Sequence, residues 1–254
     1  VTISSKTKNE NAPLPFNLAK LQVYCSQKFD YSAQKTQEIT QALREKYKAI
    51  TYNRSDSQYL NEEHFLEAPE KLKTIFENLD ISVERIDTSK KSKCFDDSKV
   101  TAHHAIIPTN TKIDTKKLNT EELNVYRAIA DFYILQFLPP QKIEVKTGEF
   151  TVKDYNFKNS GRKILDLGYR KYLNKTLDEE QQEETEVSSA IINFEDGNYD
   201  FINMLTVIED KETKPLKPYT ESTLLTDMTK VSKYITDPKI KEILLRKDEG
   251  KAGE

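Results

Sequence analysis

The chain has 254 residues, of which 36% are hydrophobic and 32% charged, and its formal net charge is −3. This length suits one large domain or two ordinary ones, and 13 tyrosines with 11 phenylalanines exclude a largely disordered chain. With no apolar run of 18 residues, no signal peptide and no lipidation motif, we expect a cytoplasmic protein without membrane contact. Only six glycines occur, and none forms a glycine-rich phosphate loop.

Acidic residues are concentrated in one segment, which changes what the net charge implies. Residues 178–186 read DEEQQEETE, and removing their six negative charges from the total of −3 leaves +3 for the rest of the chain. Basic residues cluster in two places, Lys35, Arg44, Lys46, Lys48 and Arg54, and then Lys90, Lys91, Lys93 and Lys99. These clusters can line a basic groove, or they can be solvated loops and helix faces.

Helix signals dominate the first 138 residues. Asn17 and Ser32 can cap two helices that end near Phe29 and Tyr47, because apolar residues follow each cap at spacings of three and four. Ile50 to Tyr52 then reads as a short strand. Helices that lead into a short strand and a loop suggest a winged-helix-like arrangement, which is common among nucleic-acid-binding proteins.

Two further helices are expected before residue 139. Asn61 can cap the first, which we expect to bend at Pro69. Residues 80–100 are polar and rich in lysine, which predicts a loop. Asn119 opens the longest helix, which ends near Leu138 before two prolines.

Alternating apolar residues predict a β-rich region from residue 139 onward. The expected strands include Ile143, Val145, Phe150, Val152, Tyr155 and Phe157, and then 164–172, 188–194 and 199–207. Turns are predicted at 159–161 and 196–198, and 178–186 is expected to be a solvated loop. A helix over 220–235 should turn Leu224, Met228, Val231 and Ile235 inward, and a short helix should follow Pro238.

One octapeptide, ITYNRSDS at residues 50–57, groups residues suited to phosphate chemistry. In an extended segment side chains alternate between faces, so Tyr52, Arg54 and Asp56 share one face. A tyrosine, with a reference pKa of about 10, needs a cation or a base to become a good nucleophile. Arginine offers a permanent charge and a fork of donors that fits phosphate oxygens. The segment therefore suits attack on a phosphodiester, although a solvated strand rim can have the same sequence.

Three histidines are the other candidates for chemistry. His103 and His104 are adjacent, so their side chains should diverge, and no spacing of carboxylates or thiolates nearby completes a metal site. Both histidines can have a structural role, capping backbone groups before Pro108. His64 falls in a predicted helix and is expected to be exposed.

These motifs resemble those of type IA DNA topoisomerases, particularly the topoisomerase III branch. In that family a segment reading roughly I-T-Y-x-R-T-D-S carries the catalytic tyrosine, and Ser55 replaces the usual threonine here. TAHHAIIPT at 101–109 resembles the family's A-H-x-A-I-x-P-T segment, in which His103 takes the histidine position. Supporting matches are LPFNLAKLQ, FDYSAQKTQEITQALREKYKAITY and PYTESTLLTDM. The matches span most of residues 14–245.

The resemblance implies an α+β multidomain fold with four segments. Residues 15–138 would form the helical tyrosine domain, while 1–14 and 139–217 would build a mainly antiparallel β arch. Residues 218–254 would be the start of a further helical domain. The family's Toprim domain and its G-I-G-T-P-A-T-R segment have no counterpart here, so we expect a central fragment of a larger enzyme.

The resemblance also implies a reaction. Tyr52 would attack the scissile phosphorus of single-stranded DNA, remain bonded to the 5′ phosphate, and allow strand passage and resealing without ATP. Arg54 and His103 would complete the catalytic set, with Asp56 holding Arg54. Further DNA contacts are expected from Thr51, Asp56, Ser57, Lys35 and Arg44.

Cofactor and partners follow from the same resemblance. Mg²⁺ would be bound by the Toprim domain of the same protein, and we expect no metal in this segment. Single-stranded DNA and a helicase are the expected partners of a nucleoid-associated monomer. The segment alone is expected to be inactive. The alternatives are a non-catalytic single-strand-binding module and a protein-interaction fragment.

Overall fold

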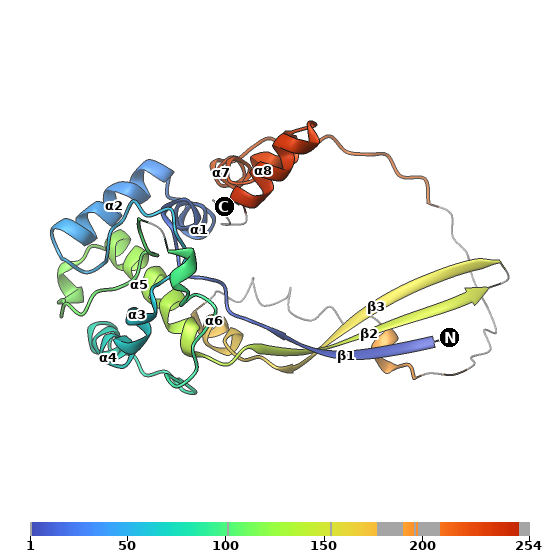
Figure 1. Cartoon of the computed structure of the whole chain (residues 1–254), viewed down its shortest axis with the longest axis horizontal. Coiled ribbons are helices and arrows are strands. Elements are labelled where there is room, and N and C mark those ends of the chain that lie inside the picture. Colours follow the sequence, from blue (N-terminus) through green and yellow to red (C-terminus); the bar gives the residue numbers. More distant parts are fainter. Residues whose placement is uncertain are drawn as a thin grey trace. The chain divides into compact units, whose positions relative to one another are not determined.

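A computed structural model describes residues 2–100, 102–152, 154–176, 190–195, 197 and 209–248. The fold is α+β and divides into two units (Figure 1). The helical unit comprises Pro13–Leu138 and Pro218–Glu254, and the sheet unit comprises Val1–Ala12 and Pro139–Lys217. Eight α-helices and one three-stranded sheet lie in the described part of the chain.

The helical unit begins with two capped helices, as the sequence predicts. The side chain of Asn17 accepts a hydrogen bond from the amide of Lys20 at 2.8 Å and starts α1, Leu18–Phe29. Ser32 does the same for the amide of Lys35 at 3.1 Å and starts α2, Ala33–Glu45. Each cap satisfies an amide that the first helical turn leaves without a partner, so the sequence fixes both starting points.

Pro69 separates two helices rather than bending one. α3, Glu62–Leu66, ends before Glu67, and α4, Ala68–Leu79, has the proline in its first turn. Proline is tolerated there because the first-turn amides have no helical partner. α5, Thr120–Ile134, opens with the expected cap at Asn119, here a capping box with Glu122, and continues into the 3₁₀ helix η3, Leu135–Phe137. Short 3₁₀ helices at Asp97–Lys99 (η1) and Thr115–Lys117 (η2) interrupt the connecting loops.

The core of the helical unit forms where α1, α2 and α5 meet. The rings of Phe16 and Phe132 stack at 4.0 Å between centroids. The buried side chains around them include Leu21, Cys25, Ile39, Leu43, Ile106, Tyr126 and Ile129. Burying one such side chain stabilises a fold by about 1.5–3 kcal/mol, so this cluster supplies the rigid base on which the loop at residues 50–57 rests.

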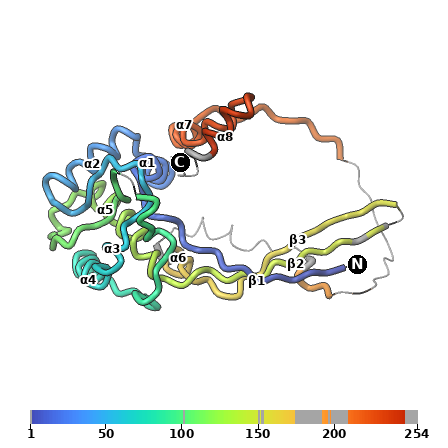
Figure 2. Tube along the Cα trace, viewed as in Figure 1, coloured from blue at the N-terminus to red at the C-terminus, as the bar shows by residue number. Residues whose placement is uncertain are grey.

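The sheet unit is a long antiparallel ribbon in the order β1-β2-β3 (Figure 2). β1, Thr2–Glu10, pairs with β2, Gln141–Val152, so the N-terminal segment joins the later β region as expected. β3, Tyr155–Asp166, pairs with β2, and Val152 lies opposite Tyr155 at the hairpin end.

Two predictions for the sheet unit are wrong. Residues 159–161 form no turn, because they belong to β3 and pair with residues 146–148 of β2. The last pair of the hairpin is instead Val152 with Tyr155. The strand expected over 164–172 ends at Asp166. Gly168 then adopts a left-handed φ of 54°, where an added Cβ would lie 2.2 Å from the carbonyl oxygen of Pro140. This turn leads into α6, Arg170–Thr176.

Most of the other predictions for this region concern segments outside the described residues. A 3₁₀ helix, η6 at Ala190–Asn193, replaces part of the strand expected over 188–194. The acidic segment 178–186 and the strand expected over 199–207 lie outside the described residues, as does most of the turn at 196–198.

The last helices run over α7, Glu221–Met228, the 3₁₀ helix η7, Val231–Tyr234, and α8, Pro238–Asp248. The helix after Pro238 is confirmed, but the single helix over 220–235 is two shorter ones. The expected inward stripe is also wrong, because Leu224, Met228 and Val231 are exposed. α7 contacts α1, and the residue that it buries is the small polar Ser222.

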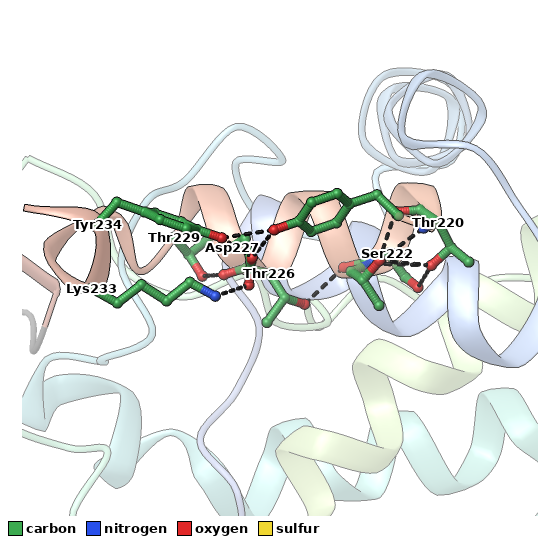
Figure 3. A network of polar contacts seen from close by, with 9 residues as sticks. Thr220, Ser222, Thr226, Asp227, Thr229, Lys233 and Tyr234 are labelled. Carbon is green, nitrogen blue, oxygen red and sulfur yellow. Dashed lines mark hydrogen bonds and ion pairs between the residues drawn. The ribbon is translucent and has the colours of Figure 1, made fainter. Parts of the chain in front are cut away.

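Polar contacts hold α7 and η7 together. The carboxylate of Asp227 accepts hydrogen bonds from the hydroxyls of Tyr219, at 2.6 Å, and Tyr234, and pairs with Lys233 (Figure 3). The hydroxyls of the two tyrosines are 2.7 Å apart. Lys233 and the two hydroxyls hold the pKa of Asp227 well below its usual range.

We predict that Asp227→Asn loosens this segment. A carboxyl with a depressed pKa stabilises the fold above its unfolded pKa of about 3.9 and loses that contribution as pH falls. Amide hydrogen exchange over residues 221–234 should therefore be faster in the variant at pH 7, and acidification should narrow the difference from wild type. Residues 120–134 serve as the internal control. Equal exchange over 221–234 in both proteins at pH 7 would contradict the prediction.

Candidate active site

The segment at residues 50–57 lies along residues 105–108, although some fifty residues separate the two in sequence. Ile50 forms an antiparallel bridge with Pro108, and the amide of Thr51 donates to the carbonyl of Ile107 at 2.9 Å. The short strand expected at 50–52 is limited to this bridge, and residues 53 and 54 form a turn. The strand predicted over residues 50–52 does not form, because backbone pairing with residues 105–108 ends after the single bridge at Ile50.

The hydroxyl of Thr51 extends this pairing. It donates to the carbonyl of Ala105 at 3.3 Å and accepts from the amide of Ile107 at 3.0 Å. With the backbone bond, Thr51 makes three hydrogen bonds to one short stretch of chain. It therefore fixes the position of the neighbouring Tyr52 relative to the segment that carries His103.

Burial alternates along the octapeptide. Asn53 and Ser55 are each 2% exposed, whereas Arg54 and Asp56 are exposed. The amide group of Asn53 donates to the Thr40 hydroxyl of α2 at 3.3 Å, and the Ser55 carbonyl accepts from the first amide of α1 at 2.9 Å. The inward residues thus anchor the loop on two helices, and the outward residues are left for solvent or a ligand.

Serine hydroxyls shape the rest of the loop. Ser55 accepts from the amide of Ser57 at 3.1 Å, and Ser57 accepts from the amide of Tyr59 at 3.1 Å. Such turns give backbone amides partners without a strand or helix. Among the expected DNA contacts, Ser57 thus has a backbone role in this structure.

The ring of Tyr52 contacts two basic side chains, Arg44 and His103. The guanidinium carbon of Arg44, in the last turn of α2, is 4.7 Å from the centroid of the Tyr52 ring. The ring of His103 stacks on the same tyrosine, with centroids 4.6 Å apart and an angle of 27° between planes. The half-buried phenol is therefore oriented by contacts to its ring.

Asp56 contacts His103 rather than Arg54. Its carboxylate oxygen lies 3.8 Å from Nδ1 of His103, although its side chain is 84% exposed. No ion pair between Asp56 and Arg54 forms within the described residues, so the expected role of Asp56 in holding the arginine is wrong. The turn at residues 53 and 54 explains this, because it breaks the extended geometry on which the expectation rested.

Lys35 is not brought to this site. It forms an ion pair with Glu121 at 2.7 Å, in which both side chains are substantially exposed. It precedes Arg44 by nine residues on the same helix, a separation of about 14 Å at 1.5 Å per residue. Of the two basic residues expected on α2, only Arg44 contacts Tyr52.

The other two histidines form a separate pair. The ring of His104 meets the ring of His64 edge to face, with centroids 4.5 Å apart, so the adjacent histidines diverge as predicted. The expectation that His64 is exposed is wrong, since its side chain is only 21% exposed and burial lowers its pKa. No sequence signal joins these residues, because forty positions separate them and their contact depends on the fold.

The described parts of the chain contain neither a metal-ligand cluster nor a helix that could span a membrane. These residues contain no group of three or more histidine, cysteine, aspartate or glutamate side chains that could hold a metal ion. The described helices are too short or too polar to cross a bilayer.

Comparison with known proteins identifies the family. A family model described as DNA topoisomerase matches residues 1–240. The chain is 34% identical to DNA topoisomerase 3 of Vibrio cholerae over 256 residues, which cover 98% of this chain and 38% of that protein. It is also 34% identical to DNA topoisomerase 3 of Haemophilus influenzae over 247 residues, covering 95% of this chain and 36% of that protein.

A solved structure agrees at the level of the fold. The full-length topoisomerase I from Thermotoga maritima matches 96% of this chain and 39% of its own, with a TM-score of 0.53 and 22% sequence identity. The chain thus spans well under half the length of the relatives that it matches. On the match of the family model to residues 1–240 and on these relatives, the chain belongs to the type IA DNA topoisomerases, in the topoisomerase 3 group.

Proposed function

We propose that this chain carries the strand-cleaving tyrosine of a DNA topoisomerase, and that the tyrosine is Tyr52. The observation that carries the proposal is the setting of its ring, which contacts both Arg44 and His103 on a loop that hydrogen bonds fix to two helices and to residues 105–107. A tyrosine held in this way, beside partly exposed arginine and histidine side chains, suits the attack on a phosphodiester better than a place in a core.

The proposed reaction is a transesterification. The hydroxyl oxygen of Tyr52 attacks phosphorus and loses its proton, and the bond between phosphorus and the 3′ oxygen breaks. The tyrosine keeps the 5′ phosphate, and the 3′ oxygen leaves as a hydroxyl after it gains a proton. Because one ester replaces another, the reverse reaction reseals the strand without ATP, after another strand has passed.

The surrounding charges have distinct proposed roles. Arg54 is exposed and has no ion-pair partner within the described residues, so its guanidinium is available to the phosphate oxygens. Arg44 places a further positive charge beside the ring, and His103 orients the ring and can donate to the phosphate. Asp56 would hold His103, since a carboxylate aimed at phosphate would repel it.

The domain assignment belongs to the same proposal. Residues 15–138 would be the winged-helix-like tyrosine domain, 1–14 and 139–217 the β arch, and 218–254 the start of a further helical domain. Mg²⁺ and the acid that protonates the leaving oxygen would come from a Toprim domain. The protein would act as a nucleoid-associated monomer in the cytoplasm, together with a helicase, and residues 1–254 alone would neither cleave nor relax DNA.

We predict that Tyr52→Phe abolishes covalent attachment to DNA and leaves single-strand binding within about threefold of wild type. The substitution removes the attacking oxygen and keeps the ring that contacts Arg44 and His103. The assay follows denaturation-resistant protein–DNA adducts, with a labelled oligonucleotide and a protein form that includes a Toprim domain.

The matched control is Tyr59→Phe, which removes a hydroxyl from the next tyrosine of the chain, seven residues on, and should leave adduct formation unchanged. If Tyr52→Phe still forms the adduct, the proposal fails. If wild type binds single strands but never forms an adduct in that protein form, a non-catalytic binding module is the better account.

We also predict that Thr51→Val lowers the rate of adduct formation by tenfold or more. Valine has a similar shape but breaks both hydroxyl contacts and leaves the amide of Ile107 without that partner, at a cost of about 1–3 kcal/mol. Thr51→Ser keeps the hydroxyl and should stay near wild type. Equal rates for the valine and serine variants would show that the hydroxyl does not position Tyr52.

A further inference from the structure

A second polar cluster lies on the other side of the histidine pair from Tyr52, and the mechanism above does not use it. Nδ1 of His104 is 2.8 Å from the carbonyl oxygen of Ala105. A carbonyl only accepts, so Nδ1 carries a proton and is occupied by this bond, which leaves Nε2 for a ligand.

Lys71 supplies a buried positive charge to this cluster. Lys71 is only 4% exposed, and its ammonium donates a hydrogen bond to the side-chain oxygen of Asn110 at 3.1 Å. An ammonium has three donors, and this is the one hydrogen bond that it makes to the described residues. Burial lowers the pKa of Lys71, so an anion placed beside it would be strongly favoured.

His64 completes the cluster and is short of a partner. Its Nδ1 is buried without a hydrogen bond in the described structure, and the nearest carboxylate oxygen, of Glu67, is 3.6 Å away. After burial, the charges of His104 and Lys71 are the largest causes of its lowered pKa. The rings of His64 and His104 thus meet within the electrostatic reach of Lys71, with Glu67 as the carboxylate beside His64.

We propose that His64, His104 and Lys71 form a second phosphate subsite, which binds a backbone phosphate of the single strand near the one that Tyr52 attacks. This inference rests on the proposed function. A phosphate offers acceptors to all three groups, and its charge relieves their mutual repulsion. A metal ion fits poorly, because the lysine would repel it.

The chain connects the two subsites directly. His103 and His104 are adjacent, and one ring stacks on Tyr52 while the other meets His64. A strand whose scissile phosphate reaches Tyr52 can therefore reach the second subsite within a few nucleotides. The partly exposed His64 and the exposed Asn110 place the edge of the cluster at the surface, next to the buried Lys71. The second contact would fix which phosphate faces the tyrosine.

The test is a scan of single uncharged methylphosphonate linkages along a labelled oligonucleotide. Binding to residues 1–254 is measured by fluorescence anisotropy. We expect wild type to lose about three- to tenfold in affinity at two positions. His64→Gln and Lys71→Met should each lose the sensitivity at one of them and keep it at the other. Both variants should also lower the slope of log affinity against log salt by about 0.7, the value for one phosphate on a single strand.

The matched control is Lys112→Gln. This lysine follows Asn110 closely and pairs with Glu77 at 2.9 Å, so its loss should leave the scan unchanged. His64→Gln keeps the inference testable if Lys71→Met fails to fold. The subsite is overturned if His64→Gln retains both sensitive positions, if wild type shows only one, or if residues 1–254 do not bind the oligonucleotide. Adduct formation by Tyr52 in the longer protein form is measured separately, so failure of the subsite leaves that proposal standing.

Discussion

The candidate site depends on three hydrogen bonds that Thr51 makes to residues 105–107. They join two loops that have little regular secondary structure, and they bring the residue before Tyr52 to the segment that carries His103. Without this junction the two rings would have no reason to stack, because neither belongs to a helix or a strand. Hydrogen bonds between two loops therefore hold the side chains of this site in place, a role that a β-sheet has in many active sites.

The rest of the helical unit makes that junction rigid. Asn17 caps α1 with its carboxamide oxygen, and its side-chain nitrogen donates to the carbonyl of Asp56 at 2.9 Å, so one residue starts a helix and holds the loop. Asn53 reaches α2 through Thr40. Both helices rest on the core with α5, which means that packing energy far from Tyr52 maintains its surroundings. The exposed Arg54 and Asp56 contribute charge rather than stability.

Local signals predict much of this fold. Neighbouring residues alone predict the helix caps at Asn17, Ser32 and Asn119 and the apolar alternation of β2. The helices that start at these caps, and the strand, are confirmed. Apolar periodicity failed after residue 220, where Leu224 and Met228 face solvent, because a stripe does not say which partner covers it. The octapeptide predicts the chemistry of the site, but the contacts of Arg44, His64 and Lys71 arise from folding across tens of residues.

Peptide mapping of the trapped protein–DNA adduct shows which residue is joined to the DNA. A protein form with a Toprim domain is reacted with a single-stranded oligonucleotide, digested with protease and nuclease, and analysed by tandem mass spectrometry. If Tyr52 is the nucleophile, one modified peptide is expected, with a nucleotide joined through its 5′ phosphate to the oxygen of Tyr52. Attachment to any other residue, or through a 3′ phosphate, would rule out Tyr52 as the nucleophile of this reaction.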